Sequence, residues 1–280
     1  MSDLPGQGPP TESWIATPAT PAAVTIGVSL KMYFGYEQTV AWCESVREIG
    51  LSHPAVVDGS VELFVIPAYP VLAMAKQVFA GTSIGLGAQN LHWEDVGPFT
   101  GEVSGSMLAE LGCRYVEVGH AERRQLFGET DYIVAAKTEA ALRNGLIPVL
   151  CIGELTRRAP EKATRSCVDQ IEAALTRSKA TVGGRIIVAY EPIWAIGAPE
   201  PAAPEHIKTV CVGLRAALQT KTGFESTVIY GGAAGPGLMT MLQGSVEGLF
   251  LGRSVHQPAA LAAVLREVKS PNQESIRRRY

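Results

Sequence analysis

The sequence predicts an α/β protein that folds as a single (β/α)8 barrel over residues 24–268. Short apolar runs rich in β-branched residues alternate with longer stretches of mixed polarity, a pattern typical of strands followed by helices. Eight such pairs follow one another in about 245 residues, which is the size of one barrel of this kind. The alternative is an open doubly wound sheet, which usually has a glycine-rich turn after its first strand. Here residues 31–35 read KMYFG, and the sequence contains neither GxGxxG nor a P-loop, so we favour the barrel.

The strands are expected where short apolar runs occur, because a strand covered by helices on one side and by the barrel interior on the other is apolar throughout. In order, they are predicted at residues 24–30, 61–66, 84–88, 114–118, 147–152, 186–190, 227–230 and 246–251. The helices between and after them are predicted at residues 37–49, 71–79, 104–111, 131–143, 161–177, 205–220, 237–242 and 259–268.

Both ends of the chain differ from the barrel in composition. Residues 1–23 are rich in Pro, Ser, Thr and Gly, which predicts a flexible extension. Residues 269–280 end in three arginines and a tyrosine, and we expect a short solvated tail that could contact a partner subunit.

The composition is typical of a soluble globular protein, with 46% hydrophobic and 18% charged residues. The net charge of −3 and the lack of a basic block argue against nucleic acid as a partner. No apolar run approaches the roughly 20 residues of a membrane span. The N-terminus lacks the basic and apolar parts of a signal peptide. The five cysteines are odd in number and scattered, which fits reduced thiols in the cytoplasm and not a disulfide framework or a zinc site.

One carboxylate, Glu191, lies at the end of the predicted buried strand in RIIVAYEPIWAIG, residues 185–197. Pro192 follows it, so the hydrogen-bond ladder of the strand should stop there. The next segment is largely apolar and ends at Gly197. This arrangement suggests a general base that an apolar flap can cover and dehydrate. The alternative is an acid that simply caps a strand end.

The turns that follow the strands of a closed barrel gather on one face, and chemically active residues occur at several of them. That face would hold Lys31, Gln89, Asn90, His120, Glu122, residues 151–154, Glu191, Gly231, Gly232, Gly252 and Arg253. Alone, Lys31 could be a surface charge and His120 a residue at a helix start. Together, a lysine, an imidazole and a carboxylate at one mouth favour a catalytic site.

The last two turns predict a phosphate site. Gly231, Gly232 and Gly252 would let backbone N–H groups approach an anion, and the loops after strands seven and eight often bind phosphate in this fold. The alternative is that these turns need glycine for a positive φ.

A carboxylate base, an imidazole and an ammonium group beside a phosphate suit proton abstraction next to a carbonyl. Glu191 would take the C–H proton, His120 would donate to the carbonyl and hydroxyl oxygens, and Lys31 would stabilise the enediolate and the phosphate. No cofactor is expected, and the sequence has neither metal-ligand spacing nor a serine nucleophile elbow.

Four segments resemble the triosephosphate isomerase family. They are GPFTGEVSGSMLAELGCRYVEVGHAERRQLFGET (97–130), PVLCIGE (148–154), AYEPIWAIG (189–197) and IYGG (229–232). The resemblance covers nearly the whole barrel. It implies a TIM barrel that isomerises a sugar phosphate through a cis-enediol(ate) without a cofactor.

The resemblance also implies a role for individual residues. Lys31 is the electrostatic residue, His120 the electrophile and Glu191 the base. Glu122 is the acid beside the histidine, and it has a structural role. Residues 192–204 resemble the closing lid of the family, in which Gly197 donates to phosphate. Thr100 matches the loop that reaches into the neighbouring subunit's site, which implies a homodimer.

This chain departs from the family pattern around the substrate. The departures are Ser29-Leu30-Lys31-Met32 for Asn-Trp-Lys-Met, Ala121 for the serine after the histidine, Ala198-Pro199-Glu200 for Thr-Gly-Lys, Ala233 for a phosphate-binding serine, and Arg253 for the second glycine of the last turn. Ser29 is small and would leave room near the reacting carbons. Arg253 could replace lost phosphate contacts with a charged pair, or it could instead pair with Glu247 or with a lid carboxylate.

The departures are similar to those of the family's tetrulose-phosphate branch, which interconverts L-erythrulose 1-phosphate and D-erythrulose 4-phosphate in erythritol catabolism. The sequence favours that branch. The alternatives are an ordinary triosephosphate isomerase and an inactive barrel that binds a sugar phosphate as a sensor or scaffold. The presence of Lys31, His120 and Glu191 argues against the inactive barrel.

Overall fold

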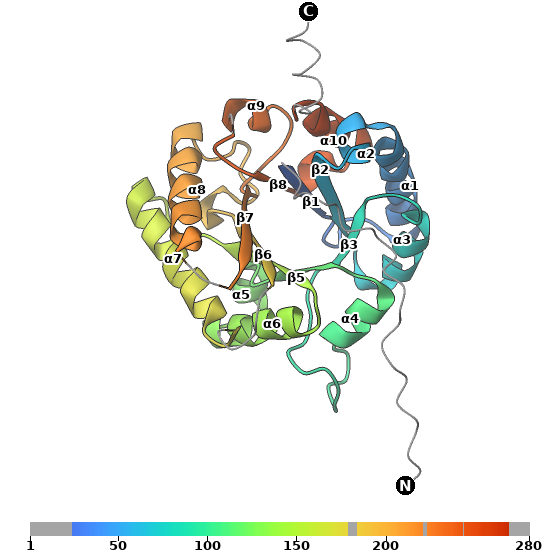
Figure 1. Ribbon diagram of the computed structural model, residues 1–280, viewed down its shortest axis with the longest axis horizontal. Helices are drawn as coiled ribbons and strands as arrows, with labels where there is room; N and C mark the ends of the chain where they lie inside the picture. Colours follow the sequence, from blue (N-terminus) through green and yellow to red (C-terminus); the bar gives the residue numbers. More distant parts are fainter. Residues whose placement is uncertain (1–23, 179–183, 221–222, 243, 269–280) are drawn as a thin grey trace, which may run out of the picture.

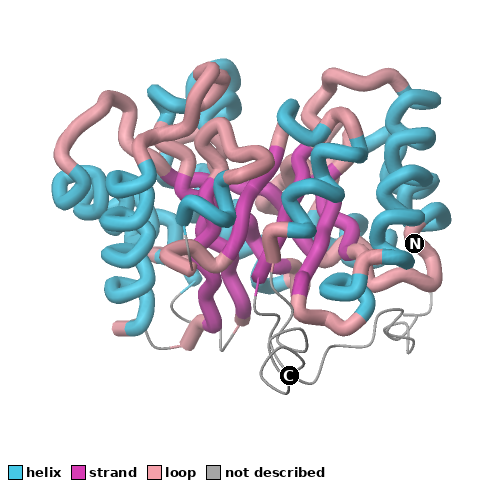
Figure 2. The backbone as a smooth tube through the Cα atoms, turned by 90° about the horizontal axis from the view of Figure 1, so that it is seen from above, coloured by secondary structure: helices cyan, strands magenta, loops and turns pink. Residues whose placement is uncertain are grey.

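In the computed structural model, which describes residues 24–178, 184–220, 223–242 and 244–268, eight strands form a closed barrel in chain order. All neighbouring pairs are parallel, and β8 pairs with β1. Helices surround the strands in the view down the barrel (Figure 1) and flank them in the side view (Figure 2). The predicted (β/α)8 barrel is therefore confirmed, and the doubly wound alternative is wrong because the sheet closes on itself. The predictions for residues 1–23 and 269–280 lie outside the described residues.

The predicted elements are found within a few residues of their expected bounds. The strands are β1 (Val24–Ser29), β2 (Val61–Ile66), β3 (Gly85–Ala88), β4 (Tyr115–Val118), β5 (Ile147–Ile152), β6 (Arg185–Tyr190), β7 (Glu225–Tyr230) and β8 (Gly248–Leu251). The helices are α1 (Tyr36–Ser52), α2 (Pro54–Val57), α3 (Leu72–Val78), α4 (Gly105–Leu111), α5 (Ala121–Phe127), α6 (Asp131–Arg143), α7 (Pro160–Leu175), α8 (Pro204–Gln219), α9 (Leu238–Leu242) and α10 (Pro258–Arg266). Single 3-10 turns occur at η1 (Tyr69–Val71), η3 (Ile193–Ala195) and η4 (Arg253–Val255). None of the helices in the described residues is long and apolar enough to span a membrane.

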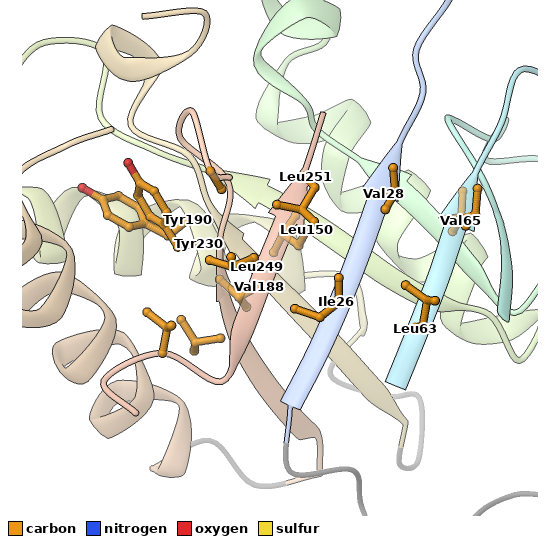
Figure 3. Packing of buried hydrophobic residues seen from close by; sticks show 14 of the residues in the cluster. Ile26, Val28, Leu63, Val65, Leu150, Val188, Tyr190, Tyr230, Leu249 and Leu251 are labelled. Carbon is orange, nitrogen blue, oxygen red and sulfur yellow. The ribbon is translucent and has the colours of Figure 1, made fainter. Parts of the chain in front are cut away.

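Side chains alternate along each strand between the barrel interior and the surrounding helices. The residues that face the helices form the larger apolar cluster, and Figure 3 shows Ile26, Val28, Leu63 and Val65 among them. Because this cluster lies between two layers of regular structure, it positions the strands and hence the turns at their ends.

The barrel interior is filled from the N-terminal ends of the strands upward. At the bottom, the Arg185 guanidinium donates to both carboxylate oxygens of Glu62, and the Tyr115 hydroxyl also donates to Glu62. Above this pair, the rings of Phe64 and Tyr115 stack with centroids 4.2 Å apart, and Phe250 lies beside them. These layers close the barrel from below, so the polar residues nearer the C-terminal ends of the strands lie on the floor of an open cavity.

Candidate active site

A cavity of about 590 Å³ opens at the C-terminal ends of the strands. This volume lies within the range of small-molecule sites. Most of the predicted site residues line it, namely Ser29, Lys31, His120, Glu122, Glu191, Gly197, Gly231, Ala233, Gly252 and Arg253. Gly232 does not line the cavity, and a Cβ there would lie 2.6 Å from the hydroxyl of Tyr230. Thr100 is exposed on the loop before α4, away from the cavity.

Lys31 follows β1 in a left-handed backbone conformation, with φ of 51°. The side chain of Gln89 supports this turn by donating to the Lys31 carbonyl at 2.8 Å. Lys31 Nζ lies 2.6 Å from Glu122 Oε1 and 3.4 Å from His120 Nε2. Burial lowers the pKa of Lys31, but the hydrogen bond to Glu122 and the charge of that carboxylate outweigh it and raise the pKa overall. The lysine therefore stays cationic beside the imidazole.

His120 is the N-cap of α5, and its Nδ1 accepts a hydrogen bond from the Glu122 backbone N–H at 3.2 Å. Burial lowers the pKa of His120, and the positive charge of Lys31 acts in the same direction. We assign the neutral tautomer with its proton on Nε2, because Nδ1 is already an acceptor. Nε2 and Lys31 Nζ are then two donors that can converge on one substrate oxygen.

Glu191 directly follows β6, and its Oε2 lies 3.7 Å from His120 Nε2. Burial raises the pKa of Glu191 to about 7. Among the described residues, Oε2 has no hydrogen-bond partner. A buried carboxylate with a pKa near neutral and an unoccupied lone pair has the properties of a general base.

Close approach, and not a positive φ, explains the two glycines of the β7 turn, whereas a Cβ at Gly252 in the β8 turn would meet open space. A Cβ at Gly231 would lie 2.6 Å from Glu191 Oε1, so only glycine leaves room for the carboxylate. Gly231, Gly232 and Gly252 do not have positive φ. The positive φ in the β7 turn belongs to Ala233, at 52°. The alternative that these three glycines serve left-handed turns is therefore wrong.

Glu117 is a site residue that the sequence reasoning missed. It lies on β4, and its Oε2 accepts a hydrogen bond from Ser29 Oγ at 2.9 Å. Its Oε1 lies 3.9 Å from His120 Nε2. Burial raises the pKa of Glu117. The signal that could have found it is a charged residue within the apolar strand YVEV, three residues before His120.

The segment predicted as a lid, residues 192–204, is held at both ends. Near its start, Trp194 Nε1 donates to Glu154 Oε1 at 2.8 Å. Near its end, the Ala202 backbone N–H donates to the Tyr230 hydroxyl at 3.1 Å. Between these contacts, Gly197 has a φ of 74° and lines the cavity.

Arg253 lies at the cavity mouth under this segment. Its Nη2 is 3.5 Å from the point where a Cβ on Gly197 would stand, and its guanidinium is 5.7 Å from the centroid of the Tyr33 ring. No ion pair joins Arg253 to a carboxylate of the described residues. Glu247 instead accepts a hydrogen bond from the Val228 N–H at 2.7 Å. An unpaired guanidinium is thus available to an anion in the cavity.

Comparisons with known proteins agree with this geometry. A family model described as triosephosphate isomerase matches residues 24–268. An L-erythrulose-1-phosphate isomerase from Pectobacterium atrosepticum is 54% identical over 246 residues, covering 87% of this chain and 95% of the relative. A triosephosphate isomerase from a Synechococcus strain is 39% identical over 228 residues, covering 79% and 89%. The solved structure of triosephosphate isomerase from Bartonella henselae matches with a TM-score of 0.75 at 27% identity, covering 88% of this chain and 98% of that chain.

Proposed function

Because this chain belongs to the triosephosphate isomerase family and is a sugar-phosphate isomerase, we propose that it interconverts L-erythrulose 1-phosphate and D-erythrulose 4-phosphate. The observation that carries the choice of substrate is the 54% identity to an L-erythrulose-1-phosphate isomerase, against 39% to the triosephosphate isomerase from Synechococcus. An ordinary triosephosphate isomerase is the second candidate, and the family match supports it.

In the proposed mechanism, Glu191 removes the proton from C3 of L-erythrulose 1-phosphate, the hydroxyl-bearing carbon next to the carbonyl. His120 Nε2–H donates to the carbonyl oxygen on C2, and the charge of Lys31 stabilises the enediolate that forms. The protonated Glu191 then returns its proton to C2. The proton of the C3 hydroxyl passes through His120 to the C2 oxygen, so that C2 carries a hydroxyl and C3 becomes the new carbonyl. Numbered from the other end, the product is D-erythrulose 4-phosphate. The pKa of about 7 for Glu191 supports both directions, since the group can hold and release a proton near neutral pH.

The phosphate is proposed to bind at the rim, between the lid and the turns after β7 and β8. Backbone N–H groups of Gly197 and of the 231–233 and 252–253 turns are the expected donors. The guanidinium of Arg253 is proposed to bind the phosphate directly. Its position at the mouth supports this, as does its lack of a carboxylate partner within the part of the chain that the structure describes.

A homodimer is proposed, in which the loop carrying Thr100 reaches the partner's site. This loop projects from the barrel between β3 and α4 (Figure 1) and exposes apolar side chains, with Val96 86% and Phe99 39% exposed. Burying them against a second copy would be favourable. The cytoplasm and erythritol catabolism are the proposed setting, and the five free, buried thiols support a reducing compartment.

The test is a coupled assay that compares kcat/KM for L-erythrulose 1-phosphate and for glyceraldehyde 3-phosphate. We expect a clear preference for the tetrulose phosphate. A preference for glyceraldehyde 3-phosphate would assign the chain as a triosephosphate isomerase. Absence of turnover with both substrates would contradict the assignment as an isomerase of either sugar.

A further inference from the structure

Ser29 and Glu117 form a polar pair that the mechanism above does not use. Ser29 is the last residue of β1, and Glu117 lies on β4. Their side chains meet inside the barrel, where Ser29 Oγ is 2.9 Å from Glu117 Oε2. Ser29 is 3% exposed and lines the cavity, whereas Glu117 is 4% exposed and lies behind it. Ser29 therefore forms part of the cavity floor, and Glu117 lies directly behind it.

Burying a carboxyl group costs folding free energy unless the group is hydrogen-bonded, so the presence of Glu117 inside the barrel needs a reason. The barrel layer beneath Glu117 is apolar, with the stacked rings of Phe64 and Tyr115. The charged groups that face Glu117 are His120, Glu191 and Lys31, and all three belong to the proposed catalytic set. The surroundings of Glu117 are thus those of the reaction site and not those of a structural ion pair such as Glu62 with Arg185.

The direction of the cavity indicates which part of a substrate reaches this pair. The proposed phosphate donors lie on turns beyond the strand ends, whereas Ser29 and Glu117 lie within strands and so deeper in the barrel. The reacting carbons must lie between, next to Glu191 and His120. A triose phosphate ends at its second reacting carbon. A tetrulose phosphate continues with one hydroxymethyl group on the side away from the phosphate.

We propose that Ser29 and Glu117 form the subsite that hydrogen-bonds the terminal hydroxymethyl group, and that this subsite selects four-carbon ketose phosphates over three-carbon sugar phosphates. The inference rests on the proposed function and identifies the residues that decide its substrate. The short side chain of Ser29 leaves space for the extra carbon. Because the Ser29 hydroxyl donates to Glu117, its lone pairs are left to accept from the substrate hydroxyl.

The energetics of such a subsite favour strong selection. An apolar pocket distinguishes one carbon only by about 10- to 200-fold, whereas a site built to hydrogen-bond a substrate hydroxyl rejects the analogue without it more strongly. The raised pKa of Glu117 favours the protonated carboxyl group, which can both donate and accept a hydrogen bond. The substrate hydroxyl also donates and accepts, so the two groups are complementary.

The experiment compares kcat/KM for L-erythrulose 1-phosphate, its 4-deoxy analogue and glyceraldehyde 3-phosphate in the wild type, Glu117→Leu, Glu117→Gln and Ser29→Ala. We expect Glu117→Leu to lower the ratio of tetrulose to triose kcat/KM by at least about tenfold. Glu117→Gln, which keeps the hydrogen bond to Ser29, should restore most of the ratio. The wild type should discriminate against the 4-deoxy analogue, and Glu117→Leu should not.

A matched control is Glu129→Gln, which removes a buried carboxylate that pairs with Arg123 and Lys137 outside the cavity. It should lower stability and leave the ratio unchanged. An equal loss for both substrates in Glu117→Leu and Ser29→Ala would overturn the proposed subsite while leaving the proposed function intact. If the variants do not fold, equal wild-type kcat/KM for L-erythrulose 1-phosphate and its 4-deoxy analogue would overturn it. A wild type that prefers glyceraldehyde 3-phosphate would refute the proposed function and the subsite with it.

Discussion

Replacing the proposed base, Glu191→Gln, should remove activity and at the same time stabilise the folded protein. Burial raises the pKa of Glu191 from its ordinary value of 4.5 to about 7. At about 1.4 kcal/mol for each pH unit between these values, keeping the buried carboxylate ionised costs the folded state about 3 kcal/mol. Glutamine has a similar shape and carries no charge, so the variant avoids this cost. Turnover should fall by roughly 10²- to 10⁴-fold, the usual contribution of a general base.

The pH dependence of this stabilisation follows from linkage. The folded state holds the proton of Glu191 more tightly than the unfolded state does. Protonation of Glu191 therefore contributes to the free energy of unfolding, and this contribution is complete below pH 4.5. It is lost as the pH rises through about 7. The gain in unfolding free energy for Glu191→Gln should therefore be largest above pH 7 and should shrink toward zero near pH 4.5.

Urea unfolding at pH 8, 6 and 5, at a fixed protein concentration, measures this gain, and the coupled assay measures turnover. Glu205→Gln is the control, because the Glu205 side chain is exposed and its loss should change neither quantity. Turnover close to wild type would refute the assignment of the base. An unchanged unfolding free energy at pH 8 would refute the argument that burial of a charged carboxylate destabilises the fold.

Three further predictions follow from the same site. The kcat/KM of the wild type should fall tenfold for each pH unit below about 7, because Glu191 must be ionised to accept a proton, and a flat profile between pH 5 and 8 would contradict this. Arg253→Gly should raise KM for the phosphorylated substrate with little change in melting temperature, and adding Ala233→Ser should recover part of the loss. The recovery is only partial because the arginine's hydrogen bond to a charged phosphate is worth about 1.5–3 kcal/mol, whereas a neutral hydrogen bond from a serine is worth about 0.5–1.5 kcal/mol. An unchanged KM would make the arginine structural. The lid, residues 192–204, should become more resistant to protease when a phosphate-bearing inhibitor binds, and Tyr230→Phe should reduce this protection because it removes the acceptor for the Ala202 N–H. Equal cleavage with and without the inhibitor would count against a closing lid.

The elements of the barrel could be predicted because each depends on local pattern. Helix α6 was expected at residues 131–143 and occupies Asp131–Arg143, with the Thr130 hydroxyl capping its start. Helix α5 was missed, because AERRQLF is seven residues long and mostly polar. It forms where His120 caps it at the end of β4. A helix of this length depends on its cap and its surroundings more than on its own residues.

Strand order also explains why most of the cavity lining could be named from the sequence. Lys31, His120, Glu191 and Arg253 each follow a strand, and in a closed parallel barrel every strand ends at the same face. Covalent order along the chain is therefore enough to place them together. Gly232 was included on the same reasoning, but it does not line the cavity.

The pairing of Ser29 with Glu117 could be decided only by the tertiary structure. The two residues are 88 positions apart and belong to strands on different parts of the barrel wall. Whether they meet depends on the stagger of the strands and on which residues of each strand face inward, and strands that are buried on both faces show neither in their sequence pattern. The same is true of Gly231, whose missing side chain makes room for the Glu191 carboxylate. Local sequence thus predicts which groups reach the mouth of a barrel, whereas contacts across its interior, which tune a pKa or select a substrate, exist only once the barrel has closed.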